Sequence, residues 1–302
     1  MIAPFVDTEW VRAHLAEVVL ADCRWYTDGR SGRDAYGAGH IPGAVFVDLD
    51  TALSGHEDPA LGGRHPLAAP QDFAAAMGAL GIGDDDTVIA YDDAGGVIAA
   101  RLVWMLRVTG HEAALLDGGL GAWDGEFETG PATAVDLTSG YRSKGRPHTD
   151  ARAKGRPRGG APVTFTAGPW PADRLASIDE VAALAAAGGT VIDARPAVRF
   201  AGAPDNLDPR PGHIPGSRSV PCGENLDADG RLLPVADLRA RFAVDDAAEV
   251  ISSCGSGVTA CHNLLAMEQA GLGDGGRLFP GSWSQWSRDP ARPVQNGDGK
   301  PR

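Results

Sequence analysis

The most reactive position in the sequence is a cysteine between a strand-like run and a helical pattern. Residues 249–253, EVISS, form a short strand-like run around the β-branched Val250 and Ile251, and the helical pattern begins near residue 258 or 259. Unpaired backbone amides and the positive end of a helix dipole favour an anion at such a junction. We therefore expect Cys254 to be a thiolate nucleophile. A small buried core residue is the alternative. The loop residues expected to bind substrate are Gly255, Gly257, Val258 and Thr259.

The other cysteines do not indicate a metal or a disulfide framework. Four cysteines occur in the chain, at positions 23, 222, 254 and 261. Their number and irregular spacing do not suit a set of disulfides, and no CxxC pair indicates zinc. Cys261 follows Cys254 by about two helical turns, so we expect it to be packed rather than catalytic.

An internal repeat places Cys254 in the second of two similar halves. GHIPG occurs at residues 39–43 and 212–216, each time after a strand-like run that ends in Asp-x-Arg. Further along, TVIAY aligns with EVISS at an offset of 162 residues, so Asp92 occupies the position of Cys254. A carboxylate cannot attack sulfur. The second half is therefore expected to be catalytic and the first to support it.

The loop, the paired GHIPG motifs and the tandem repeat resemble the rhodanese superfamily over nearly the whole chain. More narrowly, CGSGVT at 254–259 is similar to the active-site loop of mercaptopyruvate sulfurtransferases. The resemblance implies that Cys254 takes sulfur from a small anionic donor, mercaptopyruvate, and carries it as a persulfide. The acceptor would be cyanide or a thiol such as thioredoxin. No metal or organic cofactor is expected, because the persulfide is itself the carrier.

Two other functions remain open at this point. The first is the same persulfide chemistry with thiosulfate as the donor, although thiosulfate-using relatives typically carry basic residues directly after the cysteine. The second is a relay module, in which Cys254 accepts persulfide sulfur from a partner protein without turning over small donors. Donor kinetics separate these cases.

Arginines suited to a donor carboxylate are expected between residues 193 and 216. The resemblance implies one arginine before a phenylalanine, which Arg199 matches, and a second about nine residues later. Arg210 is the predicted second arginine, and an exposed loop arginine is the alternative. A guanidinium holds a carboxylate through two parallel hydrogen bonds. Related phosphatase loops have an arginine six positions after the cysteine, and Ala260 at that position argues against phosphate or arsenate chemistry.

The resemblance also implies a Ser-His-Asp arrangement of Ser256, His65 and Asp50. A histidine oriented by a carboxylate can move a proton through a serine hydroxyl. His65 lies in a polar, Gly-rich stretch, where a surface histidine is the alternative. His40 and His213, one in each GHIPG, also occur in the half without the cysteine and are expected to stabilise turns.

Alternating short β-branched runs and Ala/Leu-rich stretches predict an α/β fold. We expect two tandem rhodanese-like domains, each with a mainly parallel sheet flanked by helices. The predicted boundaries are residues 1–135 for a non-catalytic domain, 136–171 for a Gly/Pro-rich basic linker, 172–290 for the catalytic domain and 291–302 for a C-terminal tail. The linker contains KGRP twice. A solvated connector explains its composition, and a docking strip for RNA or an acidic partner is the alternative.

Length and charge agree with this organisation. A chain of 302 residues suits two domains with a core each. The net charge of -13 argues against general nucleic-acid binding. The first residues lack a basic segment followed by an apolar run, and no stretch approaches the roughly 18 apolar residues of a membrane span. We therefore expect neither nucleic acid nor a membrane as a partner, and a cytoplasmic location.

Overall fold

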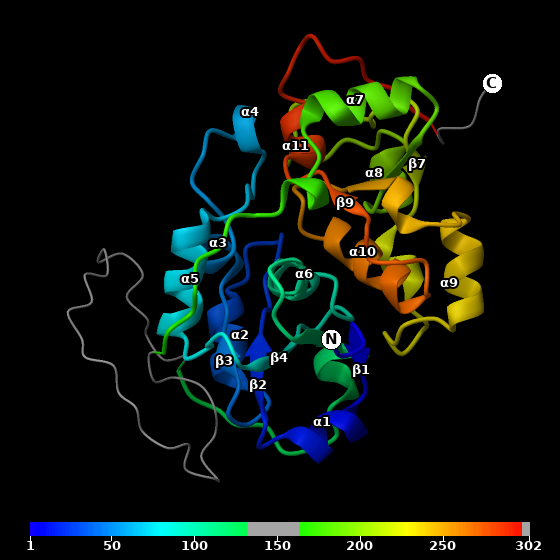
Figure 1. Cartoon of the computed structure of the whole chain (residues 1–302). Helices are drawn as coiled ribbons and strands as arrows, with labels where there is room; N and C mark the ends of the chain where they lie inside the picture. The colour runs from blue at the N-terminus through cyan, green and yellow to red at the C-terminus, as the bar shows by residue number, and fades with distance from the viewer. Residues whose placement is uncertain (132–162, 298–302) are drawn as a thin grey trace.

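The computed structural model describes residues 1–131 and 163–297 and contains two parallel sheets (Figure 1). The first has the order β1-β5-β4-β2-β3, and the second has the order β7-β6-β8-β9. All pairings within them are parallel. The strands of the first sheet are β1 (Phe5–Val6), β2 (Val18–Asp22), β3 (Val45–Phe46), β4 (Thr87–Tyr91) and β5 (Ala113–Leu116). Those of the second are β6 (Thr190–Asp193), β7 (Arg218–Ser219), β8 (Val250–Ser253) and β9 (Arg277–Leu278). The predicted fold class is confirmed.

Helices accompany both sheets. The first half contains α1 (Thr8–His14), α2 (Gly32–Ala38), α3 (Leu49–Ala52), α4 (Pro59–Gly62), α5 (Pro70–Ala79) and α6 (Ala100–Val108). The second contains α7 (Ile178–Ala186), α8 (Ala197–Phe200), α9 (Val235–Phe242), α10 (Ala260–Gln269) and α11 (Ser282–Trp286). Short 3₁₀ turns are η1 (Gly119–Ala122), η2 (Ala172–Arg174), η3 (Cys222–Asn225) and η4 (Ala247–Glu249).

Local sequence explains where the longer helices begin and end. α5 begins at Pro70, whose missing N–H costs nothing in the first turn. α7 begins with a capping box formed by Ser177 and Glu180. Gly81 and Gly188 follow the two helices with φ of 80° and 77°, a conformation that glycine adopts without steric cost. Both helices therefore end just before these glycines.

The two GHIPG motifs make equivalent contacts in both halves. Arg24 Nη2 donates to the carbonyl of Gly39 at 2.7 Å, and Arg195 Nη2 donates to that of Gly212 at 2.8 Å. Each arginine also pairs with the buried aspartate two residues before it. The repeat therefore fixes the same strand-to-turn connection twice.

Both GHIPG histidines are buried parts of these turns. The His40 ring stacks on Tyr36 and the His213 ring on Phe200, with a centroid separation of 3.7 Å in each pair. Each Nδ1 lies within hydrogen-bond distance of the backbone carbonyl of its stacking partner. These contacts match the predicted turn-stabilising role.

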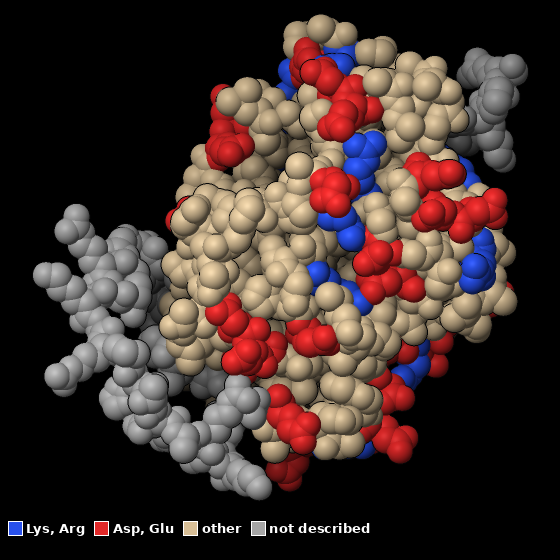
Figure 2. Space-filling view, viewed as in Figure 1, with Lys and Arg blue, Asp and Glu red and all other residues tan. Residues whose placement is uncertain are grey.

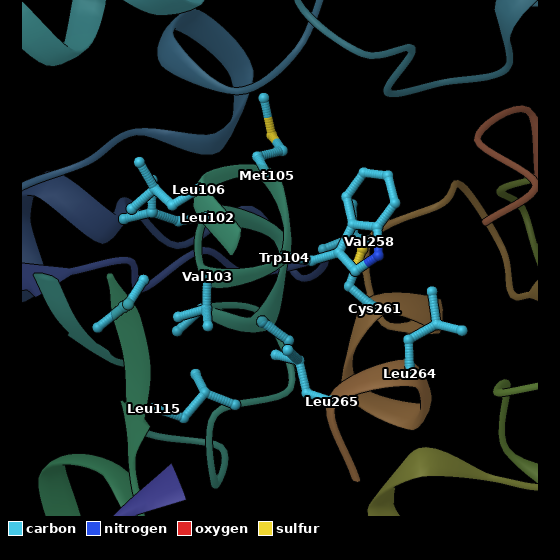
Figure 3. Packing of buried hydrophobic residues seen from close by; sticks show 14 of the residues in the cluster. Leu102, Val103, Trp104, Met105, Leu106, Leu115, Val258, Cys261, Leu264 and Leu265 are labelled. Carbon is cyan, nitrogen blue, oxygen red and sulfur yellow. The ribbon is translucent and has the colours of Figure 1, made fainter. Parts of the chain in front are cut away.

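The two halves meet along α6 and α10, which lie at the junction in Figure 1 and pack against each other. Figure 3 shows apolar side chains of α6, such as Trp104, facing Cys261, Leu264 and Leu265 of α10. All of these side chains are buried in one continuous cluster. Because burial of apolar area is the main favourable term in association, this contact fixes the halves relative to each other.

The described parts of the predicted linker and tail pack on the domains. Phe165 meets Phe73 edge-on at a centroid distance of 5.6 Å, and Trp170 Nε1 donates to the carbonyl of Ala68 at 2.9 Å. In the tail, Gln295 forms an antiparallel bridge with His213. Both copies of KGRP lie outside the described residues, and the predicted boundaries stay predictions.

Acidic side chains are spread over both halves on the face shown in Figure 2, with basic side chains lying among them. As far as the described residues form it, this face has no continuous basic area. Within residues 1–131 and 163–297, no helix is long and apolar enough to cross a membrane.

Candidate active site

The catalytic loop begins where β8 ends and wraps around the sulfur of Cys254. Cys254 is 1% exposed, and its Sγ lies 3.1 Å from the backbone nitrogen of Gly257, which donates to it. Gly257 has φ of 77°, and a Cβ there would lie 2.2 Å from the carbonyl oxygen of Pro280. Only glycine therefore fits this turn. α10 begins at Ala260, one or two residues after the predicted start.

Ser282, the first residue of α11, supports the loop. Its hydroxyl accepts a hydrogen bond from the Cys254 amide at 3.0 Å and lies 4.0 Å from Cys254 Sγ. Ser282 has φ of 49°, which is unusual for a residue other than glycine. Ser282 was not among the predicted site residues, because an ordinary serine before a tryptophan carries no signal of its backbone conformation.

Ser256, His65 and Asp50 come together as predicted, across the junction of the two halves. The Ser256 Oγ lies 2.8 Å from His65 Nδ1, and His65 Nε2 lies 3.3 Å from Asp50 Oδ1. Trp25 Nε1 donates to the other Asp50 oxygen at 2.9 Å. The hydrogen bond from His65 has the largest effect on Asp50 and lowers its pKa below the usual range. Partial burial is the second largest effect and opposes this decrease. His65 and Ser256 are both buried, so His65 is not the alternative surface histidine.

A buried arginine from α6 ties this arrangement to the catalytic loop. Arg101 is fully buried and donates through Nη1 to the carbonyl of Gly257 at 2.8 Å and through Nη2 to that of His65 at 3.0 Å. Burial lowers its pKa. Arg101 therefore positions His65 relative to the loop that carries Ser256. This role is visible in the sequence only as one charge within the apolar stretch around residues 98–106.

Arg199 lies beside the loop, but Arg210 does not. The Arg210 guanidinium donates to the backbone carbonyls of Trp286, Ser287, Asp289 and Arg292. It does not line the cavity above Cys254. The hypothesis that Arg210 binds the donor carboxylate is therefore corrected: its hydrogen bonds stabilise the chain after α11.

Arg64, from the first half, lies beside Arg199 at the loop. A Cβ built on Gly255 would lie 3.2 Å from Arg64 Nη2 and 3.6 Å from Arg199 Nη1. The two guanidinium groups therefore converge on the residue next to the nucleophile. The position nine residues after Arg199 is Asp208, which forms ion pairs with both arginines.

These groups surround one cavity of about 830 Å³ between the halves. Gly255, Val258 and Thr259 line it as predicted, whereas Gly257 does not and contacts the sulfur through its amide. The first half contributes Trp25, Tyr26 and Ile98 among others. Cys222 also lines the cavity. Its pKa is raised to about 12, mainly by burial and to a smaller extent by the nearby Cys254. All four cysteines are free, and the described residues contain no cluster suited to a metal.

Two segments of the chain, residues 7–126 and 177–289, match the rhodanese-like domain. The chain belongs to the rhodanese-like family. A probable 3-mercaptopyruvate sulfurtransferase of Pseudomonas aeruginosa is 37% identical over 98% of this chain and 99% of its own length. A putative thiosulfate sulfurtransferase, SseB, of Mycobacterium tuberculosis is 38% identical over 93% of this chain and 91% of its own length. The crystal structure of the 3-mercaptopyruvate sulfotransferase SseA from Escherichia coli superposes with a TM-score of 0.73 at 32% identity, covering 93% of this chain and 99% of that one.

The first rhodanese-like domain shows what the catalytic loop of the second can bind. Its loop holds the carboxylate of Asp92 with four backbone amides at 2.7 to 2.9 Å. The donors are Ala94, Gly96, Ile98 and Ala99. Burial raises the pKa of Asp92, and these hydrogen bonds oppose the rise. The loop of the first domain is therefore an anion-binding site, and the Asp92 side chain of the same loop occupies it.

Proposed function

We propose that the protein is a 3-mercaptopyruvate sulfurtransferase that works through a persulfide on Cys254. The observation that carries the proposal is the cavity that brings Cys254, the Ser256-His65-Asp50 chain and two arginines together. The relatives named for this activity cover nearly the whole chain and support it. A thioredoxin-type acceptor and a cytoplasmic location stay predictions.

The first half-reaction forms the persulfide. The Cys254 thiolate attacks the thiol sulfur of mercaptopyruvate, and the carbon–sulfur bond breaks. Its electron pair goes to carbon as the enolate of pyruvate, which takes up a proton to give pyruvate. Ser256 belongs to the same loop as Cys254, and its hydroxyl contacts His65. It is therefore the group placed to pass that proton.

The second half-reaction returns the enzyme to its starting state. A nucleophilic acceptor attacks the outer sulfur, the sulfur–sulfur bond breaks, and its electrons stay on Cys254 as the thiolate. With cyanide the product is thiocyanate. Until that attack, the inward-facing amides of the loop stabilise the anionic persulfide, as the equivalent amides hold Asp92 in the first domain.

Thiosulfate is the second candidate donor. The SseB relative is named for it, and the arginines near Gly255 supply positive charge that a dianion would use. The loop itself carries no basic residue beside Cys254, since Gly255 and Ser256 follow it. The Ser256-His65-Asp50 chain favours mercaptopyruvate, because only that donor leaves an enolate that needs a proton.

Steady-state kinetics with cyanide as the acceptor test the assignment. We expect a higher kcat/KM with mercaptopyruvate than with thiosulfate. A clearly higher value with thiosulfate would overturn the donor assignment and leave the persulfide mechanism standing. Negligible turnover of both donors, with persulfide accepted from a protein donor, would identify a relay module instead.

A further inference from the structure

Arg101 differs from every other buried arginine in the described part of the chain, because it has no carboxylate partner. The buried arginines of residues 1–131 and 163–297 are Arg24, Arg101, Arg107 and Arg195. The other three each form an ion pair with an aspartate or a glutamate. Arg101 has no exposed surface and donates instead to the backbone carbonyls of Gly257 and His65. An unpaired buried charge is costly, so a negative charge is expected near it.

The thiol of Cys261 does not supply that negative charge. Its sulfur faces the carbonyl of Gly257 at 3.5 Å, on the same oxygen that accepts from Arg101. Burial has the largest effect on Cys261 and raises its pKa to about 12, although Arg101 opposes the rise. Cys261 is therefore a neutral thiol at neutral pH.

Cys254 is the remaining group, and one residue lies between it and Arg101. The carbonyl of Gly257 accepts from Arg101 Nη1 at 2.8 Å, and the amide of Gly257 donates to Cys254 Sγ at 3.1 Å. Burial lowers the pKa of Arg101, and negative charge on Cys261 or Cys254 opposes this decrease. Attraction between two charges is mutual, so a cation that an anionic sulfur stabilises also stabilises that anion.

The other groups around the loop that can carry positive charge already contact carboxylates. These groups are Arg64, His65, Arg195 and Arg199. The carboxylates that they contact are those of Asp50, Asp193, Asp205 and Asp208. The charge of Arg101 is therefore the one that a thiolate in this loop would neutralise.

We propose that Arg101, contributed by the non-catalytic domain, is the buried counter-charge that keeps Cys254 ionised, first as the thiolate and then as the persulfide. The inference rests on the proposed function, because it concerns the nucleophile named there. Arg101 does not line the cavity, so it acts on Cys254 through the electrostatic field and is a positioning residue. The nucleophile then has its full reactivity only when the two domains are packed together.

The experiment measures how fast iodoacetamide alkylates Cys254 at different pH values, followed on the Cys254 peptide by mass spectrometry. The reagent reacts with a thiolate and not with a thiol, and it needs no sulfur donor. Arg101→Gln keeps an N–H donor but removes the charge. We expect it to raise the pH of half-maximal alkylation rate by at least about one unit, the lower end for losing a neighbouring opposite charge. Arg101→Lys keeps the charge and should stay within about half a unit of wild type, below that limit.

Arg107→Gln is the matched control, because Arg107 is a buried arginine of the same helix whose charge Glu268 already compensates. It should lower stability in urea and leave the alkylation profile unchanged. An unchanged profile in Arg101→Gln, or an equal shift in Arg101→Lys, would overturn the inference. If Arg101→Gln does not fold, Arg101→Lys decides: a retained profile supports the inference, and a shift of about one unit or more overturns it. The expected shifts in a protein that does not turn over mercaptopyruvate would refute the proposed function alone.

Discussion

At the scale of single residues, Cys254 and Cys261 show how position decides the behaviour of a thiol. Cys254 accepts a hydrogen bond from the Gly257 amide and lines the cavity. Cys261 is fully buried, its Sγ faces the carbonyl of Gly257 at 3.5 Å, and burial raises its pKa to about 12. Only the first thiol therefore meets a donor.

We predict that Cys254→Ser abolishes sulfur transfer, whereas Cys261→Ser keeps most of it. Intact-mass measurement after treatment with mercaptopyruvate should show one added sulfur on wild type and on Cys261→Ser. Cys254→Ser should show none, and labelling that persists in that variant would contradict the assignment of the nucleophile.

The hydrogen-bonded chain from Ser256 to Asp50 gives a second prediction. Ser256→Ala removes the hydroxyl that contacts His65 Nδ1, so a step that needs proton transfer slows. kcat with mercaptopyruvate should fall by about 10²-fold, the lower end for general acid–base catalysis. kcat with thiosulfate should fall by much less, because no carbanion forms. Equal losses with both donors would indicate a structural role for Ser256.

At the scale of elements, α10 begins directly after the Cys254 loop and contains a buried histidine next to Cys261. His262 is fully buried and meets Phe5 edge-on at 5.5 Å. Burial lowers its pKa to about 4 from 6.5. The helix therefore contains a neutral imidazole that resists protonation.

This burial makes stability depend on pH. Between pH 6.5 and about 4 the unfolded chain binds a proton at His262 that the folded chain does not, so the free energy of unfolding falls as pH falls. At about 1.4 kcal/mol per pKa unit the loss is roughly 3 kcal/mol. In urea titrations His262→Gln should show a correspondingly smaller decrease over this range. The exposed His56→Gln variant is the control, and an unchanged pH dependence in His262→Gln would contradict the assignment.

At the scale of the whole molecule, function depends on the two domains being packed as one unit. Cys254 and Ser256 come from the second domain, while His65 and Asp50 come from the first. Separately folded domains would hold no complete site. The apolar contact between α6 and α10 is the largest element-to-element contact that joins them (Figure 3).

We predict that weakening this contact lowers stability and activity together. Leu265 is 2% exposed within the α6–α10 cluster, so Leu265→Ala should lower the free energy of unfolding by about 2 to 4 kcal/mol. Urea denaturation measures this change. Val235→Ala, at a half-exposed position of α9, should cost well under 1 kcal/mol. Comparable losses in the two variants would contradict the role of the junction.

The sequence alone determined the α/β class and the tandem repeat and predicted Cys254 as the nucleophile, because these depend on short-range patterns and on two copies that can be compared. GHIPG, the Asp-x-Arg strands and the strand–cysteine–helix order are local features, so they can be recognised without the tertiary structure. The resemblance added Ser256, His65 and Asp50, which lie up to 206 residues apart in sequence and meet across the junction.

Only the tertiary structure decided which other side chains complete the cavity. Arg210 was the predicted second arginine although it lies eleven residues after Arg199 rather than about nine, and the chain after α11 folds over it and takes its hydrogen bonds. Arg64 and Arg101 approach the loop from the other domain, at distances that no local pattern encodes. A guanidinium group can donate hydrogen bonds to a ligand, to a carboxylate or to a backbone carbonyl. The role of an arginine therefore depends on which of these partners lies within reach once the domains are packed.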